Sequence, residues 1–244
     1  QSGGGGGGRV AIVCPVPIGL SLTNVTANGA PGYGIGGAGT VHVRQGNVAP
    51  TLVVRGSDRE TPLPSLNADE HLILDGARVV TTHLTAARLV LTNGAVLTHP
   101  MNDLGPEQFL ELSVVDLVID AGSTIDVSAR GYLGGRRGDN GANESGRTLG
   151  NTTTGGSTRR NGGSYGGLGA GGLAETTVNS VYGDFANPGE LGSGGGSGSG
   201  SAASGGGLVR ISAARLMIEG AIVADGGAGS FYGGGGSGGG ILLS

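Results

Sequence analysis

Lysine and tryptophan are absent from this 244-residue sequence, so all 14 basic residues are arginine. A phosphate-binding P-loop needs a lysine after its glycines, and the composition therefore excludes that nucleotide site. The 18 acidic residues leave a net charge of −4, which argues against the basic surface of a nucleic-acid-binding protein. We expect neither nucleotides nor nucleic acids as ligands.

Cysteine and long apolar runs are also scarce. Cys14 is the single cysteine, which rules out a disulfide within the chain. We expect it to be a small packed side chain, with a bridge between two copies as the alternative. No apolar stretch approaches ~18 residues, so we expect no membrane insertion. Because the sequence begins and ends in glycine-rich repeats, we expect it to be excised from a longer polypeptide.

Glycine is abundant and large side chains are few: there are 57 glycines, and aromatic residues make up only 3%. Such a chain cannot bury an ordinary core of large side chains, and glycine loses the most backbone freedom on folding. An ordered glycine tract must be held by hydrogen bonds from its backbone to other segments. This requirement favours tight solenoid coils or stacked polyglycine helices with polyproline-II-like geometry over a flexible linker.

Internal repetition organises the sequence into one module, residues 1–244. A unit at about 9–44 and another at 208–244 share one order: a short strand, a second strand, a Gly/Tyr loop and a closing strand. A third unit, at about 110–207, has the same strand pair followed by a long glycine-rich insertion. The glycine-poor stretch 51–99 reads as successive rungs of a solenoid.

Three corners mark the ends of the second strands. They are Ala27-Asn28-Gly29, Ala129-Arg130-Gly131 and Ala224-Asp225-Gly226. Their shared place in the repeat predicts that they are structurally equivalent. We also predict that the insertion at 132–207 is ordered by backbone hydrogen bonds, with extended polyproline-II-like dihedrals.

Alternating apolar residues and turn pairs support the rungs. Asp75-Gly76 and Asn93-Gly94 supply the positive φ angles that sharp corners need. Like strands recur about every 20–28 residues, a period typical of parallel β-helices. The alternation predicts inward side chains at Leu89, Leu91, Val96, Val118, Ile125 and Val127. One short helical turn is expected within 100–112. The fold class that follows is all-β, a right-handed parallel β-helix or solenoid with ordered polyglycine-II-like segments.

Several strings, in a fixed order, resemble the glycine-rich β-solenoid repeat units of very large bacterial extracellular and surface (adhesin-like) proteins. They include GGGGGGRVAIV (3–13), LVIDAGSTIDVSARGYLGG (117–135), GGGLVRISAARLMIEGAIVADGG (205–227) and GGGGSGGGIL (233–242). In that family a closing strand is followed by more glycine and the next opening strand, so this chain resembles one full period of an array. The resemblance covers most of the chain except about 51–85 and 174–188. It implies an extracellular structural or adhesive array and supplies no catalytic residues.

Residue types that carry chemistry do not form recognisable sites. The four histidines, His42, His71, His83 and His99, lack metal-ligand spacing, and the acidic and amide residues of 139–144 lack that of a calcium loop. We expect no metal and no cofactor. The triplet Arg137-Gly138-Asp139 arises readily by chance in a chain rich in Gly and Arg.

A paired-carboxylate site is the fairest test for an enzyme. Asp116 and Asp120 are the candidates for such a site in a β-helical carbohydrate-active enzyme. Asp120, however, lies at an Asp-Ala-Gly corner, which explains it without catalysis. We expect that the protein is not an enzyme.

The five tyrosines lie in or beside glycine-rich segments. They are Tyr33, Tyr132, Tyr165, Tyr182 and Tyr232. Their rings are candidates for an adhesive or sugar-stacking surface, and the favoured alternative is that they cover bare glycine backbone.

We expect a structural subunit or repeat of an extracellular fibre, sheath or giant surface protein, located at the cell surface. Its partners would be copies of itself, head to tail or in tandem, with cell-surface glycans as second candidates. Neither end of the predicted solenoid has a cap, which leaves strand edges open for pairing. The candidate self-association residues are Val10, Ala11, Ile12, Val13, Ile241, Leu242 and Leu243. The alternative function is a ligand-binding adhesin tip that uses the Gly/Tyr loops, followed by the carbohydrate-active enzyme.

Overall fold

The computed structural model describes the chain as a β-rich fold. The described residues are 3–16, 19–30, 32–63, 66–172 and 177–244. Within them there is no α-helix, and the helical elements are two single 3₁₀ turns, η1 (Leu22–Asn24) and η2 (Gly138–Asn140). The chain divides into two compact units. Unit 1 holds residues 1–98, 112–125 and 212–221, and unit 2 holds 99–111, 126–211 and 222–244.

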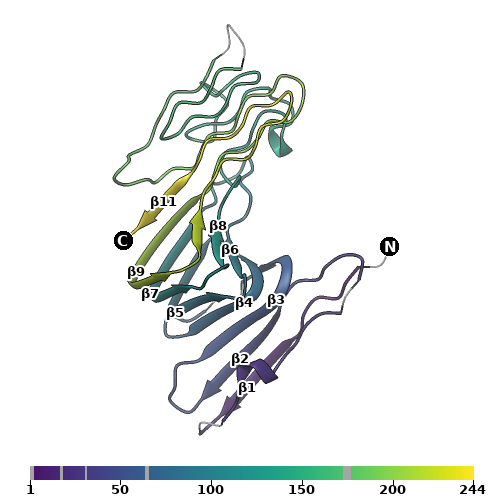
Figure 1. The fold of residues 1–244 in the computed structure, drawn as a ribbon, viewed down its shortest axis with the longest axis vertical. Coiled ribbons are helices and arrows are strands. Elements are labelled where there is room, and N and C mark those ends of the chain that lie inside the picture. Colours follow the sequence, from purple (N-terminus) through teal and green to yellow (C-terminus); the bar gives the residue numbers. More distant parts are fainter. Residues whose placement is uncertain (1–2, 17–18, 31, 64–65, 173–176) are drawn as a thin grey trace. The chain divides into compact units, whose positions relative to one another are not determined.

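Eleven strands form one large, mixed, largely parallel sheet, and Figure 1 labels all of them except β10. They are β1 (Arg9–Cys14), β2 (Gly39–Gln45), β3 (Thr51–Pro62), β4 (His71–Val80), β5 (His83–Thr92), β6 (Val96–Thr98), β7 (Leu110–Ile119), β8 (Thr124–Asp126), β9 (Leu208–Ile218), β10 (Ala221–Val223) and β11 (Gly240–Leu243). The main path runs β1-β2-β3-β4-β5-β7-β9-β11, and β6, β8 and β10 pair beside it.

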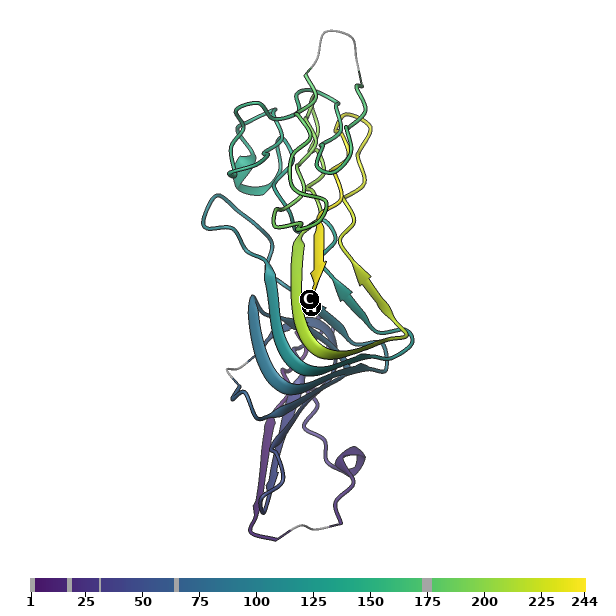
Figure 2. The same ribbon diagram turned by 90° about the vertical axis from the view of Figure 1, so that its left-hand side faces the viewer.

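Parallel pairing in register builds columns of buried side chains in unit 1. Leu52, Leu72 and Leu89 align across β3, β4 and β5, and all three are buried. A second ladder places Leu97 of β6 between Val79 of β4 and Ile125 of β8. Figure 2 shows the bent strands of this unit nested one against the next. Stacked aliphatic side chains therefore form the core of unit 1, although the glycine-rich composition leaves few large side chains elsewhere in the chain.

The sheet departs from the predicted parallel order where β2 meets β3. Strand β2 pairs antiparallel with β3, with Val41 opposite Val53. Only residues 46–50 join these two strands, and Gly46 has a positive φ of 52°. A connection this short allows a hairpin, because a parallel pair needs a crossover of a dozen residues or more.

The predicted inward positions are confirmed at four of six sites. Those four are Leu89, Leu91, Ile125 and Val127, each fully buried. The prediction is wrong for Val96 and Val118, which are half-buried, because Leu97 and Leu117 take the inward places beside them. A strand has a period of two, so an error of one residue in phase exchanges the two faces.

Of the local turn predictions, the corners at 75–76 and 93–94 are confirmed, and the others are not. Gly76, Asn93 and Gly94 have φ angles of 60°, 55° and 75°, which confirms the corners that these pairs were expected to form. The three predicted equivalent corners differ, since Ala129 alone among their alanines has a positive φ, of 55°. The helical turn expected within 100–112 is absent, and this segment enters β7 through bends.

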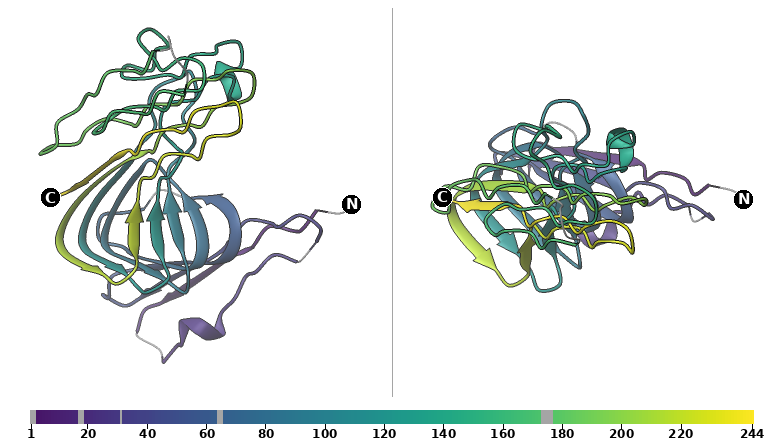
Figure 3. Two further views of the ribbon diagram at one scale, coloured as in Figure 1. Left: turned by 45° about the horizontal axis from the view of Figure 1, so that its top comes forward. Right: turned by 90° about the horizontal axis from the view of Figure 1, so that it is seen from above.

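Unit 2 consists largely of glycine-rich segments that hydrogen-bond to one another without forming regular strands (Figure 3). In residues 192–197 two sets of backbone hydrogen bonds repeat every three residues. Gly192 and Gly195 donate to Gly206 and Ala203, whereas Gly194 and Ser197 donate to the segment 144–147. The backbone of this run therefore bonds to neighbours on several sides, which confirms that backbone hydrogen bonds order the insertion.

Close backbone approach explains why these positions are glycine. A Cβ atom built on Gly195 would lie under 3.0 Å from the carbonyl oxygen of Gly234, closer than real Cβ contacts. The side chains that do pack in unit 2 form a small cluster of Tyr132, Leu191 and Leu208. Unit 2 thus replaces most of a side-chain core with packed backbone.

Candidate functional site

The first candidate surface is the free edge of β1. This strand begins the path through the sheet and pairs in parallel with β2. Val10 and Ile12 are half-buried and pack against Val41, Val43 and Val53, while Ala11 and Val13 are exposed on the other face. Among the described strands none pairs with the second edge of β1, so its backbone groups there face away from the sheet.

The second candidate surface is the free edge of β11, which ends the same path. Its register with β9 places Ile241 beside Val209 and Leu243 beside Ile211. Val209 and Ile211 are buried, but Ile241 and Leu243 remain 37% and 44% exposed. The two side chains thus continue a buried apolar face with no further described strand to cover them. Leu242 is half-buried.

A glycine run precedes each of these edge strands. In the N-terminal run (residues 3–8), Gly4 and Gly7 donate to the carbonyl groups of Gly34 and Gly37. Gly5 and Gly8 in the same run donate to Ala30 and Ala27. The side of the run at Gly3 and Gly6 is open, because a Cβ atom added to either residue would meet nothing within 4 Å.

The C-terminal run (residues 234–239) is open in the same manner. Gly234 and Ser237 donate to Gly196 and Ser193, and Gly236 and Gly239 donate to Gly227 and Ala224. The N–H groups of Gly235 and Gly238 have no acceptor among the described residues. Every third N–H of this run is therefore unpaired, whereas each N–H of the inner run 192–197 finds a partner.

Sequence reasoning named the apolar strand residues but missed these glycines. In a run of glycines the sequence does not distinguish the residues whose N–H groups are unpaired, one in three, from those whose N–H groups are hydrogen-bonded. Only the hydrogen-bond directions separate them.

The tyrosines are divided between interior and surface. Tyr132 and Tyr165 are buried and Tyr182 is half-buried, whereas Tyr33 and Tyr232 are exposed. The Tyr132 hydroxyl donates to Glu107 at 2.6 Å, and the Tyr182 hydroxyl donates to the Leu191 carbonyl group at 2.5 Å. Burial raises the pKa of both phenols well above the usual range. Tyr132 lies in the apolar cluster with Leu191 and Leu208, and Tyr182 packs against that cluster.

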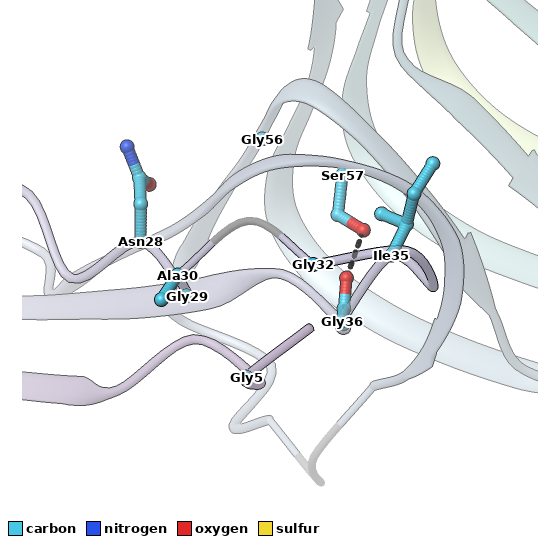
Figure 4. Close-up of a pocket in the computed structure, with 10 residues that line it drawn as sticks. Gly5, Asn28, Gly29, Ala30, Gly32, Ile35, Gly36, Gly56 and Ser57 are labelled. Carbon is cyan, nitrogen blue, oxygen red and sulfur yellow. Dashed lines mark hydrogen bonds between the residues drawn. The ribbon is translucent and has the colours of Figure 1, made fainter. Parts of the chain in front are cut away.

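One surface hollow is lined mainly by glycine. It has a volume of about 330 Å³ and lies in unit 1, between the N-terminal run and the turn at Gly56. Figure 4 shows Asn28 and Ser57 at this hollow, with the Ser57 hydroxyl donating to the Gly36 carbonyl group at 2.5 Å. Since none of the described lining residues is charged, the hollow brings together no acid–base pair.

The carboxylates proposed for catalysis are not brought together as a free pair. Both oxygens of Asp116 accept hydrogen bonds from Arg215, one of them at 2.8 Å. These bonds, with the charges of Arg215, Arg88 and His71, hold the pKa of Asp116 below its usual value. Asp116 of β7 and Arg215 of β9 thus form an ion pair between strands on the surface of the sheet.

The remaining motif residues are also dispersed. His42 approaches Glu70 at 3.5 Å, and His99 is buried. In the part of the chain that is described, no cluster of three or more His, Cys, Asp or Glu residues could hold a metal ion. Arg137 precedes η2 and caps it without a side-chain hydrogen bond.

Comparisons with protein-family models, curated proteins and solved structures found no match to this chain. Among the described residues, no helix has the length and apolar character needed to cross a membrane. The physical features of the two edges therefore carry the functional argument.

Proposed function

We propose that this chain is a structural module of an extracellular fibre, sheath or giant surface protein, and that its copies associate head to tail. The observation that carries the proposal is the pair of open edges. At each edge, a strand with one edge unpaired among the described strands follows a glycine run that has a free row of backbone groups. Isolated β proteins normally cover or charge such edges, because unpaired strands recruit other strands.

The architecture that fits this role is a right-handed parallel β-solenoid with a polyglycine-II-like bundle. The stacked registers of β3, β4 and β5 support a solenoid, and parallel crossovers are right-handed in nearly all proteins. The three-residue repeat of hydrogen bonds in 192–197 supports the bundle, since polyproline-II helices have three residues per turn. An open-ended solenoid propagates when both ends remain free.

The proposal that the chain is structural rather than enzymatic rests on its side chains. Asp116 is occupied by Arg215, and the glycine-lined hollow has no charged lining residue. The second candidate, an adhesin tip, draws on exposed rings. Phe231 is 84% exposed and packs edge-on against Tyr232, over which the guanidinium of Arg160 lies 4.6 Å from the ring centroid. Such rings could stack on sugars.

Sedimentation over a series of protein concentrations, with negative-stain electron microscopy, tests the assembly. We expect mass to rise with concentration and linear polymers to form. Ile241→Asp should abolish this growth, because it places a charge in the contact face of β11. Val115→Asp is the matched control, since Val115 is an exposed strand residue on β7, away from both edges.

A protein that stays monomeric at the highest concentration would overturn the head-to-tail proposal. Binding to immobilised glycans by that monomer, with loss on Phe231→Ser, would support the adhesin tip instead.

A further inference from the structure

The junctions between glycine runs and strands follow one hydrogen-bond rule. At the β1–β2 junction, Gly7 donates to Gly37 at 2.9 Å, and the first paired strand residues are Arg9 and Thr40. The donor thus lies two residues before its strand position and the acceptor lies three residues before its own.

The β9–β11 junction repeats the rule at the other end of the chain. Gly206 donates to Ser237 at 2.8 Å, and Leu208 pairs with Gly240. One turn earlier, Ala203 donates to Gly234, as Gly4 donates to Gly34 in the first junction. The rule therefore holds at two independent places.

The unpaired backbone groups at the two ends of the chain occupy these same positions: the donor position is two residues before a strand pair, and the acceptor position is three residues before it. Gly238 lies two residues before Gly240, in the donor phase, and its N–H has no acceptor among the described residues. Gly6 lies three residues before Arg9, in the acceptor phase, and no described group donates to its carbonyl oxygen. The same is true one turn earlier for Gly235 and Gly3.

We infer that a second copy of this chain fills the open row, with Gly240 of one copy paired in parallel with Arg9 of the next. In this register Gly238 and Gly235 donate to the carbonyl groups of Gly6 and Gly3 in the neighbouring copy. The inference rests on the proposed head-to-tail association and adds its partner segment and register.

The side chains agree with this register. It places Ile241 beside Val10 and Leu243 beside Ile12 of the neighbouring copy. Within each copy, Ile241 already continues from Val209, and Val10 continues to Val41. The result is an unbroken apolar column from β9 and β11 of one copy into β1 and β2 of the next. A slip by one residue would place Ile241 against Arg9 or Ala11 and expose the apolar face.

A glycine requirement follows from the same rule. A Cβ atom on Gly206 or Gly7 would lie under 3.0 Å from the backbone nitrogen of Gly239 or Gly39, two residues beyond the acceptor. By this relation Gly238 abuts Gly8 of the neighbouring copy. In the single chain, a Cβ atom on Gly238 meets only the Ala224 carbonyl oxygen, at an ordinary 3.7 Å.

Gly238→Ala therefore separates folding from association. We expect its thermal unfolding to match the parent protein, and its association constant to fall about tenfold or more, because the added methyl group overpacks the junction. Gly166→Ala is the matched control: nothing lies within 4 Å of its added Cβ, and Gly166 is outside both runs. Association of Gly238→Ala at the parent strength would overturn the inference.

Cysteine cross-linking tests the register directly in a Cys14→Ser background. Ala11→Cys combined with Leu242→Cys places the two cysteines opposite each other on neighbouring parallel strands, with their Cα atoms about 4.8 Å apart and within disulfide range. We expect a ladder of covalent multimers on non-reducing gels under mild oxidation. Val13→Cys with Leu242→Cys is the control, because a slip of two residues separates these strand positions by about 8 Å.

The outcomes separate the two proposals. Polymers that cross-link through position 13 in preference to position 11 would overturn the register and leave head-to-tail association standing. A chain that forms no polymer at all would overturn both.

Discussion

At the scale of single residues, the buried imidazole of His99 couples folding to pH. Its Nδ1 atom donates to the Pro100 carbonyl oxygen at 2.7 Å, which leaves Nε2 unprotonated and without a hydrogen-bond partner. Burial lowers the pKa of His99 from 6.5 to about 4; the bond to Pro100 opposes this shift, and the charge of Arg130 adds to it. Between pH 6.5 and about 4, His99 is therefore protonated in the unfolded chain but neutral in the folded protein.

We expect the free energy of unfolding to fall as the pH is lowered from 6.5 to about 4. The loss should approach about 3 kcal/mol, from ~1.4 kcal/mol for each unit of pKa difference. His99→Asn keeps a donor near the Nδ1 position but does not titrate, and it should flatten this part of the profile. Urea unfolding at a series of pH values measures both; equal slopes in the two proteins would contradict the assignment.

Arg55 is a second residue with a defined structural task. Its Nε atom donates to Asp75 at 2.7 Å, and its NH1 nitrogen donates to the carbonyl groups of Leu22 and Val25 at 3.0 Å. Burial raises the pKa of the Asp75 carboxyl group, but hydrogen bonds from Asn93 and Arg55, with the Arg55 charge, outweigh it and lower the pKa overall. Arg55 thereby fastens the segment around η1 to the sheet.

Arg55→Met should release this segment and cost about 2 kcal/mol of stability, because charge-assisted hydrogen bonds are lost. Hydrogen exchange measured on peptides covering residues 19–30 should accelerate, while exchange in β4 and β5 should change little. Unchanged protection of the segment would show that other contacts hold it.

At the scale of elements, the strands and the glycine runs are held by different forces. Strands β3, β4 and β5 stack aliphatic side chains, whereas the run 192–197 stacks backbone on backbone. An apolar core yields a little when a methyl group is added or removed. A backbone-packed run has no side chain that can move aside.

Gly195→Ala should therefore destabilise the protein by about 2–3 kcal/mol, since its Cβ atom would collide with the Gly234 carbonyl oxygen and separate two hydrogen-bonded runs. Thermal unfolding of this variant and of Gly166→Ala gives the comparison, because the second substitution adds the same methyl group in open space. Equal unfolding temperatures would mean that the runs tolerate side chains.

At the scale of the whole molecule, the two edges are chemically alike, and Arg9 is the one charged residue of β1 and β11. None of the seven association residues, Val10 to Val13 and Ile241 to Leu243, carries a charge. Backbone hydrogen bonds and apolar burial, which salt screens very little, would join the copies.

We accordingly expect the association constant to change less than about twofold between low and physiological ionic strength, and to rise in sulfate, which strengthens apolar burial. Sedimentation at one protein concentration across these buffers checks it. A steep fall with sodium chloride would point to Arg9 or other charged groups near the edges as the contacts.

Local pattern was sufficient to predict much of the fold. Alternation placed Leu89, Leu91, Ile125 and Val127 inside, and Asn93-Gly94 marked a corner, because strand period and positive φ depend on neighbours along the chain. The apolar strands near both ends were visible for the same reason.

Tertiary structure alone decided the rest. The antiparallel β2–β3 pair, the burial of Tyr132 and the row of free N–H groups at Gly235 and Gly238 depend on which distant segments lie alongside. A glycine has no side chain whose polarity or size could indicate its neighbours. In a chain with 57 glycines, the hydrogen-bond partner of each backbone group is therefore set only when the segments pack.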